Sequence, residues 1–150
     1  MKKLVLLASI LVMTSTSCQT SKEDNKMSLD ENKKISTLYH ERNLEDVDKL
    51  LSEDFVGSYY YQDSIPIIWN KENHKNAITN NPNVRDSILI QVAEGDWVAE
   101  RFIRTMENEG NIMKAEGMQF KQFKNGKIIR SWEIFSPIQG SNETEPSEVN

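Results

Sequence analysis

The chain has 150 residues, enough for one globular domain, with an apolar fraction of 37% and a charged fraction of 27%. It carries 23 acidic and 18 basic residues; taking Lys2 and Lys3 from the basic set leaves 16 and changes the formal charge from −5 to −7. This acidic balance argues against nucleic-acid binding, which requires a basic surface. The sequence has no spaced His, Cys and carboxylate cluster and no glycine-rich phosphate loop, so we expect no metal and no cofactor.

The first segment combines a basic start with a short apolar run. Met1-Lys2-Lys3 precedes ten largely apolar residues, too few to span a bilayer, and small residues then lead to Cys18, the only cysteine. This pattern resembles a bacterial lipoprotein signal. The resemblance implies removal of residues 1–17 and lipidation of Cys18. The polar residues that follow show no apolar periodicity and predict a flexible tether over residues 18–27. We therefore expect a lipid-anchored protein of the bacterial cell envelope, in the outer membrane on its periplasmic or outer face. A free cysteine after an ordinary signal peptide is the alternative.

Two helices are predicted at the start of the folded part. Ser28 and Glu31 fit a capping box for a helix that runs to about residue 42. Asn43 fits the cap of a second helix, which carries an apolar stripe over residues 44–51. A β-prone run over residues 55–61 follows, and Asn70 fits the cap of a short helix that ends near residue 78.

The second half reads as a meander of strands. Alternating segments over residues 84–93, 97–106, 112–123 and 127–135 are separated by turn residues, and Asn125-Gly126 is the strongest hairpin signal. Helices ahead of a run of antiparallel strands favour an α+β fold over residues 28–138. Residues 139–150 lack large apolar side chains except Val149, and we expect them to be disordered.

Three stretches in this order resemble a known fold family. Residues 50–55 (LLSEDF), 94–102 (EGDWVAERF) and 117–133 (GMQFKQFKNGKIIRSWE) are similar to motifs of the SnoaL-like branch of the nuclear-transport-factor-2-like superfamily. The resemblance implies a cone: a curved antiparallel sheet wrapped around the N-terminal helices, with a pocket on its concave face and dimers that form through the sheet. This superfamily contains cyclases, isomerases, dehydratases, hydrolases and binding proteins, so function has to be argued from the pocket.

Glu133 is the candidate catalytic residue that the resemblance implies, as a general base assisted by a neighbour at Gln119. Gln119 cannot titrate, and Ser131 stands where the motif often has His, so the acid–base pair is incomplete. The alternative is that Glu133 pairs with Arg101 or Arg104 and closes the pocket floor. We expect the pocket lining to comprise Tyr59, Tyr61, Trp69, Arg101, Gln119, Phe123, Ser131, Glu133 and Phe135.

The register of the last hairpin decides which residues share a face with Glu133. A two-residue Asn-Gly loop pairs Lys124 with Lys127 and, in a regular ladder, puts Glu133 on the face of Met118. A three-residue loop with a bulge pairs Phe123 with Lys127 and puts Glu133 on the face of Gln119. We predict the second register.

The other polar and aromatic candidates have plainer interpretations. His40 and His74 lack ligand-like neighbours in sequence and are interpreted as surface or helix-end residues. Trp132 should lie on the outer sheet face, where an apolar patch with Ile128 and Ile134 would form a homodimer interface.

Three functions remain open from the sequence. The first is a lipoprotein whose cone binds a small, partly apolar molecule without catalysis. The second is a cyclase-, isomerase- or dehydratase-like enzyme with Glu133 as the base. The third is a surface interaction module that uses the outer sheet face.

Overall fold

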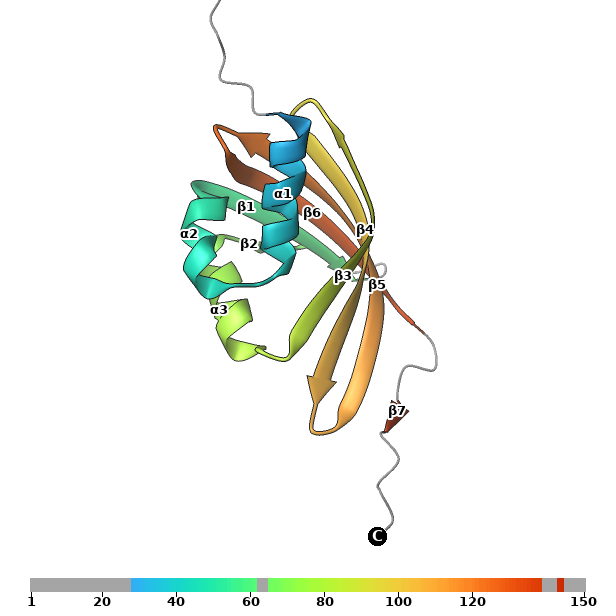
Figure 1. Cartoon of the computed structure of the whole chain (residues 1–150). Coiled ribbons are helices and arrows are strands. Elements are labelled where there is room, and N and C mark those ends of the chain that lie inside the picture. The colour runs from blue at the N-terminus through green and yellow to red at the C-terminus, as the bar shows by residue number, and fades with distance from the viewer. Residues whose placement is uncertain (1–27, 62–64, 139–142, 145–150) are drawn as a thin grey trace, which may run out of the picture.

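Helices cover one face of a curved, unclosed sheet in the computed structural model, which describes residues 28–61, 65–138 and 143–144 (Figure 1). The helical elements are α1 (Leu29–His40), the 3-10 helix η1 (Leu44–Asp46), α2 (Val47–Leu50) and α3 (Lys71–Asn80). The strands are β1 (Leu51–Tyr61), β2 (Ile67–Trp69), β3 (Val84–Glu94), β4 (Trp97–Asn108), β5 (Asn111–Lys124), β6 (Lys127–Pro137) and β7 (Glu143–Thr144). The predicted α+β class and cone shape are confirmed.

The sheet has the strand order β2-β1-β6-β5-β4-β3, and β7 pairs with β5 outside this path. Neighbouring strands run antiparallel except for β1 and β6, which are parallel. The expected antiparallel sheet therefore contains one parallel pair. This pairing joins the N-terminal part of the chain to the end of the meander and places β6 near the middle of the sheet.

Two helices begin where the sequence predicts them. The Ser28 side chain accepts a hydrogen bond from the Glu31 backbone N–H, and the Glu31 carboxylate accepts one from the Ser28 backbone N–H. Asn70 and Asn73 make the same reciprocal cap at the start of α3. These caps satisfy backbone donors that a helix N-terminus leaves without partners.

The segment after Asn43 differs from the prediction. The expected second helix is reduced to η1 and one turn of α2, and β1 begins at Leu51 rather than Phe55. Leu51 pairs with Ile128 of β6, so tertiary strand pairing prevails over the helical stripe. Strand β2 was not predicted, because three residues are too few to show alternation.

The hairpin of β5 and β6 combines features of both predicted registers. Lys124 pairs with Lys127 across the two-residue Asn125-Gly126 loop, so the predicted three-residue loop is wrong. Phe123 then pairs with Ile128 but Gln122 with Arg130, which leaves Ile129 as an extra residue in β6. This bulge shifts the alternation by one position. Glu133 therefore faces Gln119 after all, as predicted, and the two are direct cross-strand partners.

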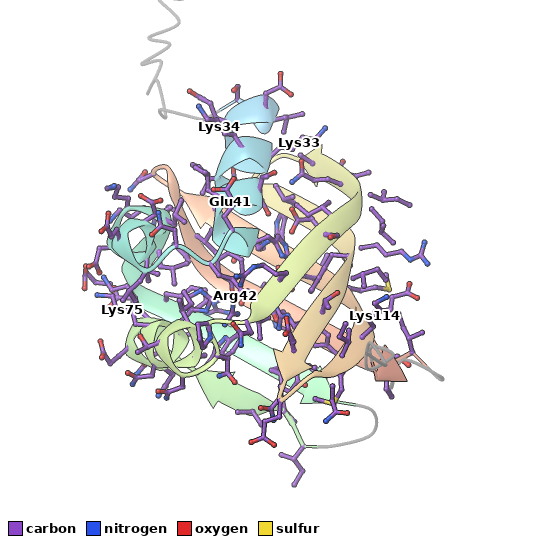
Figure 2. All side chains as sticks on the ribbon, turned by 60° about the horizontal axis from the view of Figure 1, so that its bottom comes forward. Lys33, Lys34, Glu41, Arg42, Lys75 and Lys114 are labelled. Carbon is purple, nitrogen blue, oxygen red and sulfur yellow. The ribbon has the colours of Figure 1, made fainter. Side chains whose placement is uncertain are left out.

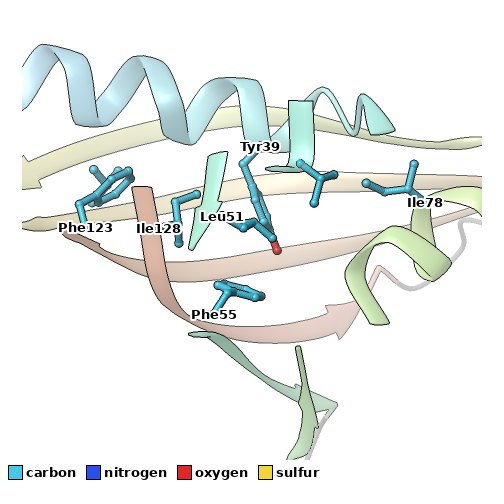
Figure 3. Packing of buried hydrophobic residues seen from close by; sticks show 8 residues of the cluster. Tyr39, Leu51, Phe55, Ile78, Phe123 and Ile128 are labelled. Atoms are coloured by element: carbon cyan, nitrogen blue, oxygen red, sulfur yellow. The ribbon is translucent and has the colours of Figure 1, made fainter. Parts of the chain in front are cut away.

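The main apolar core lies between the helices and the concave sheet face (Figure 3). Phe55, Leu51 and Ile128 contribute from β1 and β6, and Tyr39 and Ile78 from α1 and α3. A second cluster of Phe102, Ala115 and Phe135 lies further along the sheet. Fully burying one such side chain stabilises the fold by about 1.5–3 kcal/mol relative to leaving it exposed.

Several sequence predictions fall outside the described residues. The signal segment over 1–17, the tether over 18–27 with Cys18, and residues 139–142 and 145–150 of the tail belong to this group. Glu143 and Thr144, within the expected disordered tail, form β7. No helix in the described part of the chain is long and apolar enough to cross a membrane.

Candidate functional site

A polar network occupies the concave face of the sheet under α1. Strand alternation directs Glu100 and Arg104 of β4, Lys121 of β5 and Glu133 of β6 toward the helix. All but Arg104 are buried residues, and the Arg104 side chain is only 14% exposed. Burying so many charged groups is costly unless they are paired, so the pairing partners define what the site can do.

Glu133 is fully buried and is hydrogen-bonded through one of its two oxygens. Its Oε1 accepts hydrogen bonds from Tyr39 Oη, at 3.1 Å, and from Gln119 Nε2. Its Oε2 has no hydrogen-bond partner within the described residues, and Arg104 Nη1 lies 3.7 Å away. Burial and the charge of Glu133 raise the pKa of Tyr39 well above its ordinary value, so Tyr39 remains a proton donor in this pair.

Arg104 links Glu133 to a second carboxylate. Its Nε and Nη2 donate to the two oxygens of Asp86 at 2.8 and 2.7 Å, in a bidentate pair. Burial alone would lower the pKa of Arg104, but the hydrogen bonds with Asp86 and the charge of Glu133 raise it above its ordinary value. Arg104 is therefore a permanent cation between two carboxylates.

The network continues from Asp86 toward α1. His40 lies between two carboxylates, with Nδ1 3.0 Å from Asp86 Oδ2 and Nε2 2.7 Å from Glu100 Oε2. Lys121 Nζ donates to Glu100 and, at 2.8 Å, to Ser36 Oγ. Burial would raise the pKa of Glu100, but the pairs with His40 and Lys121 hold it below its usual range. Burial in turn lowers the pKa of Lys121.

A cavity of about 180 Å³ lies beside this network. Its lining is aromatic and aliphatic apart from one guanidinium: Tyr59, Trp69, Arg104, Met106, Ala115 and Phe135. Arg104 is thus shared by the cavity and the network. Glu133 and Gln119 do not line the cavity; Glu133 is joined to its lining by Arg104 and by its strand partner Tyr59.

Gly57 explains how Trp69 reaches the cavity wall. The two residues are cross-strand partners of β1 and β2. A Cβ atom at Gly57 would lie 1.3 Å from Trp69 Nε1, so the indole occupies the space that a side chain would fill. The indole ring also meets His74 edge-on, with ring centroids 5.7 Å apart.

The structure places the predicted site residues in different parts of the molecule. Tyr59, Trp69 and Phe135 line the cavity, and Gln119, Ser131 and Glu133 are buried on the same concave face. Phe123 packs in the apolar core, and the side chain of Tyr61 is outside the described part of the structure.

Arg101 does not belong to the pocket, contrary to prediction. It is exposed on the outer face and pairs with Glu116. Alternation along β4 places Glu100, Phe102 and Arg104 inward and therefore Arg101 outward. Phe102, a large apolar residue, is expected to point inward, and Arg104 lies two positions further along the same strand. This spacing could have identified Arg104, rather than Arg101, as the pocket residue.

The histidines were also interpreted too simply. His40 does end α1, but it is buried in the polar network, and His74 is buried against Tyr39 with ring centroids 4.6 Å apart. Asp86, Tyr39 and Met106 were missed as well, since nothing local in the sequence marks them. Within the described residues, no group of three or more His, Cys, Asp or Glu could hold a metal ion.

Comparison with solved structures identifies the fold. No protein-family model and no curated protein sequence matches the chain. IdmH, a candidate polyketide cyclase from Streptomyces antibioticus, superimposes with a TM-score of 0.56 at 17% identity, covering 71% of this chain and 90% of that one. A candidate polyketide cyclase from Bacillus cereus gives a TM-score of 0.58 at 18% identity, covering 71% and 74% of the two chains.

A third structural neighbour has a different activity. An LEH-like epoxide hydrolase from M. tuberculosis superimposes with a TM-score of 0.59 at 14% identity, covering 72% of this chain and 84% of that one. At these identities the likeness concerns the fold. The chain has the cone fold of the SnoaL-like polyketide cyclases, of the nuclear-transport-factor-2-like type.

Proposed function

We propose that the cone binds a small, partly apolar molecule that carries a carbonyl or hydroxyl oxygen. The observation that carries this proposal is the 180 Å³ cavity with one charged group, Arg104, in an otherwise apolar lining. Apolar parts of the ligand contact Tyr59, Trp69 and Phe135, as is usual for small-molecule pockets. A ligand oxygen accepts a hydrogen bond from Arg104 Nη1, which has no hydrogen-bond partner in the described residues.

The charges around Arg104 favour a neutral ligand. Asp86 already neutralises the guanidinium, and Glu133 lies 3.7 Å from Nη1 on the other side. An anionic ligand would be repelled by both carboxylates in a site of low dielectric constant. A carbonyl or hydroxyl oxygen gains the hydrogen bond without that repulsion.

Catalysis with Glu133 as the general base is the second candidate. It is favoured by Glu133 Oε2, a buried carboxylate oxygen without a hydrogen-bond partner among the described residues. Such an oxygen, beside a cation that could stabilise developing negative charge, fits proton abstraction next to a carbonyl group. Gln119 cannot titrate, so Glu133 would act without a second carboxylate beside it, with Tyr39 and Gln119 as its hydrogen-bond donors.

Filling the cavity tests the binding proposal. Ala115 is 6% exposed and lines the cavity, so Ala115→Leu should remove space that the ligand occupies. We expect native mass spectrometry of the purified protein to detect a bound small molecule that Ala115→Leu loses and Ala99→Leu, on the outer face, retains. Equal occupancy in all three proteins, or no bound molecule in any, would contradict binding in the cone.

Glu133→Gln separates binding from catalysis with the molecule identified in this way. If the protein only binds, affinity should change within a few-fold and the molecule should emerge unaltered from both proteins. If Glu133 is the base, the wild-type protein should convert the molecule and Glu133→Gln should lose at least about 100-fold in rate. Conversion at an equal rate by both proteins would exclude Glu133 as the base.

We also propose that the protein is lipid-anchored through Cys18 in the bacterial cell envelope. The short apolar run and the single cysteine support this location. Cys18→Ser should release the protein from the membrane fraction. Its continued presence there would exclude the anchor.

A further inference from the structure

A second cleft, separate from the cone cavity, opens at the C-terminal end of α1. Its volume is about 480 Å³, and none of its lining residues also lines the cone cavity. Figure 2 shows Glu41 and Arg42 where α1 ends. Arg42 contacts Ala77 of α3 there. The lining residues come from three segments of the chain: Glu41, Arg42, Asn43, Leu44, Ile78, Asn81, Pro82, Val84 and Arg85.

Arg42 is a half-buried cation in this cleft. It follows α1 with a φ of 55°, in the left-handed region, and its Nη2 donates to the carbonyl oxygen of Ala77 at 3.0 Å. Within the described residues it forms no ion pair with a carboxylate. Burial lowers the pKa of Arg42, as does the positive charge of Arg104. The negative charge of Asp86 offsets this effect only in part, since no carboxylate of the described residues contacts the guanidinium directly. A partly desolvated guanidinium without a contacting carboxylate is costly, and a bound anion would lower that cost.

Arg85 is a second guanidinium in the same cleft. Its Nη1 donates to the carbonyl oxygens of Val84, at 2.8 Å, and Pro82, which leaves Nε and Nη2 without partners among the described residues. Arg85 also forms no ion pair there, whereas Arg101 pairs with Glu116 and Arg104 with Asp86. Two unpaired arginines in one cleft are unexpected in a protein with a formal charge of −5.

The remaining lining limits the class of anion. Leu44, Ile78, Pro82 and Val84 add apolar surface, which favours a ligand with a hydrocarbon part. Glu41 adds one negative charge, which disfavours a dianion such as phosphate. Guanidinium groups match the planar shape of a carboxylate and bind it through two hydrogen bonds.

We propose that this cleft binds a small apolar monocarboxylic acid, with its carboxylate between Arg42 and Arg85 and its hydrocarbon part against Leu44 and Val84. The cleft shares no lining residue with the cone cavity. The cone cavity offers one guanidinium flanked by two carboxylates, whereas this cleft offers two guanidiniums and a single carboxylate. The two sites therefore select ligands of different charge.

Octanoate is the probe for the test, and octanamide is its neutral counterpart. In a titration of the ¹⁵N-labelled protein followed by NMR, we expect octanoate to shift the amide resonances of Asn43, Asn81 and Arg85. We expect octanamide to bind at least about tenfold more weakly than octanoate, because it lacks the charge that the arginines recognise. Inorganic phosphate should bind more weakly than octanoate.

Substitutions at two exposed arginines supply the matched control. Arg85→Met should weaken octanoate binding about tenfold, because it removes one charged donor and keeps an apolar side chain. Arg130→Met, at an exposed arginine of β6 without an ion pair in the described residues, should leave the affinity unchanged. Arg42→Met should weaken binding like Arg85→Met. Arg85 is the decisive variant because its side chain is exposed, so we expect the substitution to leave the fold intact.

Three results would overturn the proposal. The first is that octanoate shifts resonances of the cone lining and none at the cleft. The second is that octanamide binds as tightly as octanoate. The third is that Arg85→Met and Arg130→Met change the affinity equally.

Discussion

His74 is a buried histidine whose charge is opposed by its surroundings. It is 3% exposed and stacks on Tyr39. Burial, followed by the positive charges of Arg42 and Arg104, lowers the pKa of His74 to about 3. The unfolded chain binds a proton at this position near pH 6.5, and the folded protein does not. The folded state is therefore favoured above that pH and loses stability as the pH falls.

The difference between the pKa of His74 in the folded and unfolded states predicts that the protein loses stability when the pH falls below about 6.5. Between pH 6.5 and 5, His74 should lower the free energy of unfolding with a slope approaching 1.4 kcal/mol per pH unit, a figure good to about a factor of two. Urea denaturation at pH 7, 6 and 5 measures this slope. His74→Phe keeps the stacking and should show a flatter dependence. Parallel curves for the two proteins would exclude His74 as the source.

The buried carboxylates respond at lower pH. Burial would raise the pKa of Asp86, but its hydrogen bonds with Arg104 and His40 hold it below its ordinary range, and Glu100 is held low in a similar way. Their stabilising effect is present above their unfolded pKa values and is lost below about pH 4.5. The range between pH 6.5 and 5 thus isolates the effect of His74 from theirs.

At the scale of elements, close contact between β5 and β4 depends on a glycine. Gly117 pairs with Phe102, and a Cβ atom at Gly117 would lie 2.4 Å from the Phe102 ring. Phe102 is fully buried against His40 and Phe135, so its ring cannot move aside. The absence of a side chain at Gly117 therefore lets this part of the sheet curve around the ring.

Gly117→Ala tests this packing. It should lower the free energy of unfolding by about 1–3 kcal/mol, because overpacking a filled core forces side chains or backbone to shift. Denaturant unfolding measures the loss, and the double variant Gly117→Ala with Phe102→Leu should lose less than the two single variants together. Additive losses would show that the alanine is not in contact with the ring.

At the scale of the whole molecule, the outer face of the sheet is apolar over several strands. Phe120, Met118 and Ile134 are about half exposed, and Trp97 stacks on Trp132 with ring centroids 5.4 Å apart. Ile128, predicted to join this patch, is instead fully buried in the core because the bulge at Ile129 reverses its direction. The remaining patch is of the kind that marks protein interfaces.

We propose that this outer face forms a homodimer. Phe120→Glu should give a monomer in sedimentation experiments, because a charge in a buried apolar interface opposes association. Met113→Glu is the control, since Met113 is exposed to a similar extent on the opposite face of β5. A wild-type monomer would exclude the dimer. The same face would serve the surface-interaction alternative, in which Trp132→Ala alters the phenotype and Ala115→Leu does not.

The sequence alone determined the local features of this protein. Ser28 and Asn70 cap their helices, and Asn125-Gly126 turns the last hairpin, because capping and turn formation depend on residues within a few positions of one another. Alternation along β4 to β6 and the order of the elements were sufficient for the α+β class, and the resemblance of three sequence stretches to a known fold family supplied the cone shape. Glu133 and Gln119 were correctly predicted to share one face. The predicted cause was a three-residue loop with a bulge, whereas the structure has a two-residue loop and a bulge at Ile129.

The tertiary structure alone decided the composition of the site. The contacts of α1 with the sheet join residues far apart in the chain: Tyr39 with Glu133 and His40 with Glu100 are separated by 94 and 60 positions. The bulge at Ile129 arises where β6 must pair with both β5 and β1, which local sequence does not reveal. Arg104 therefore became the charged group of the cavity in place of Arg101, since long-range pairing and packing select the inward-facing residues.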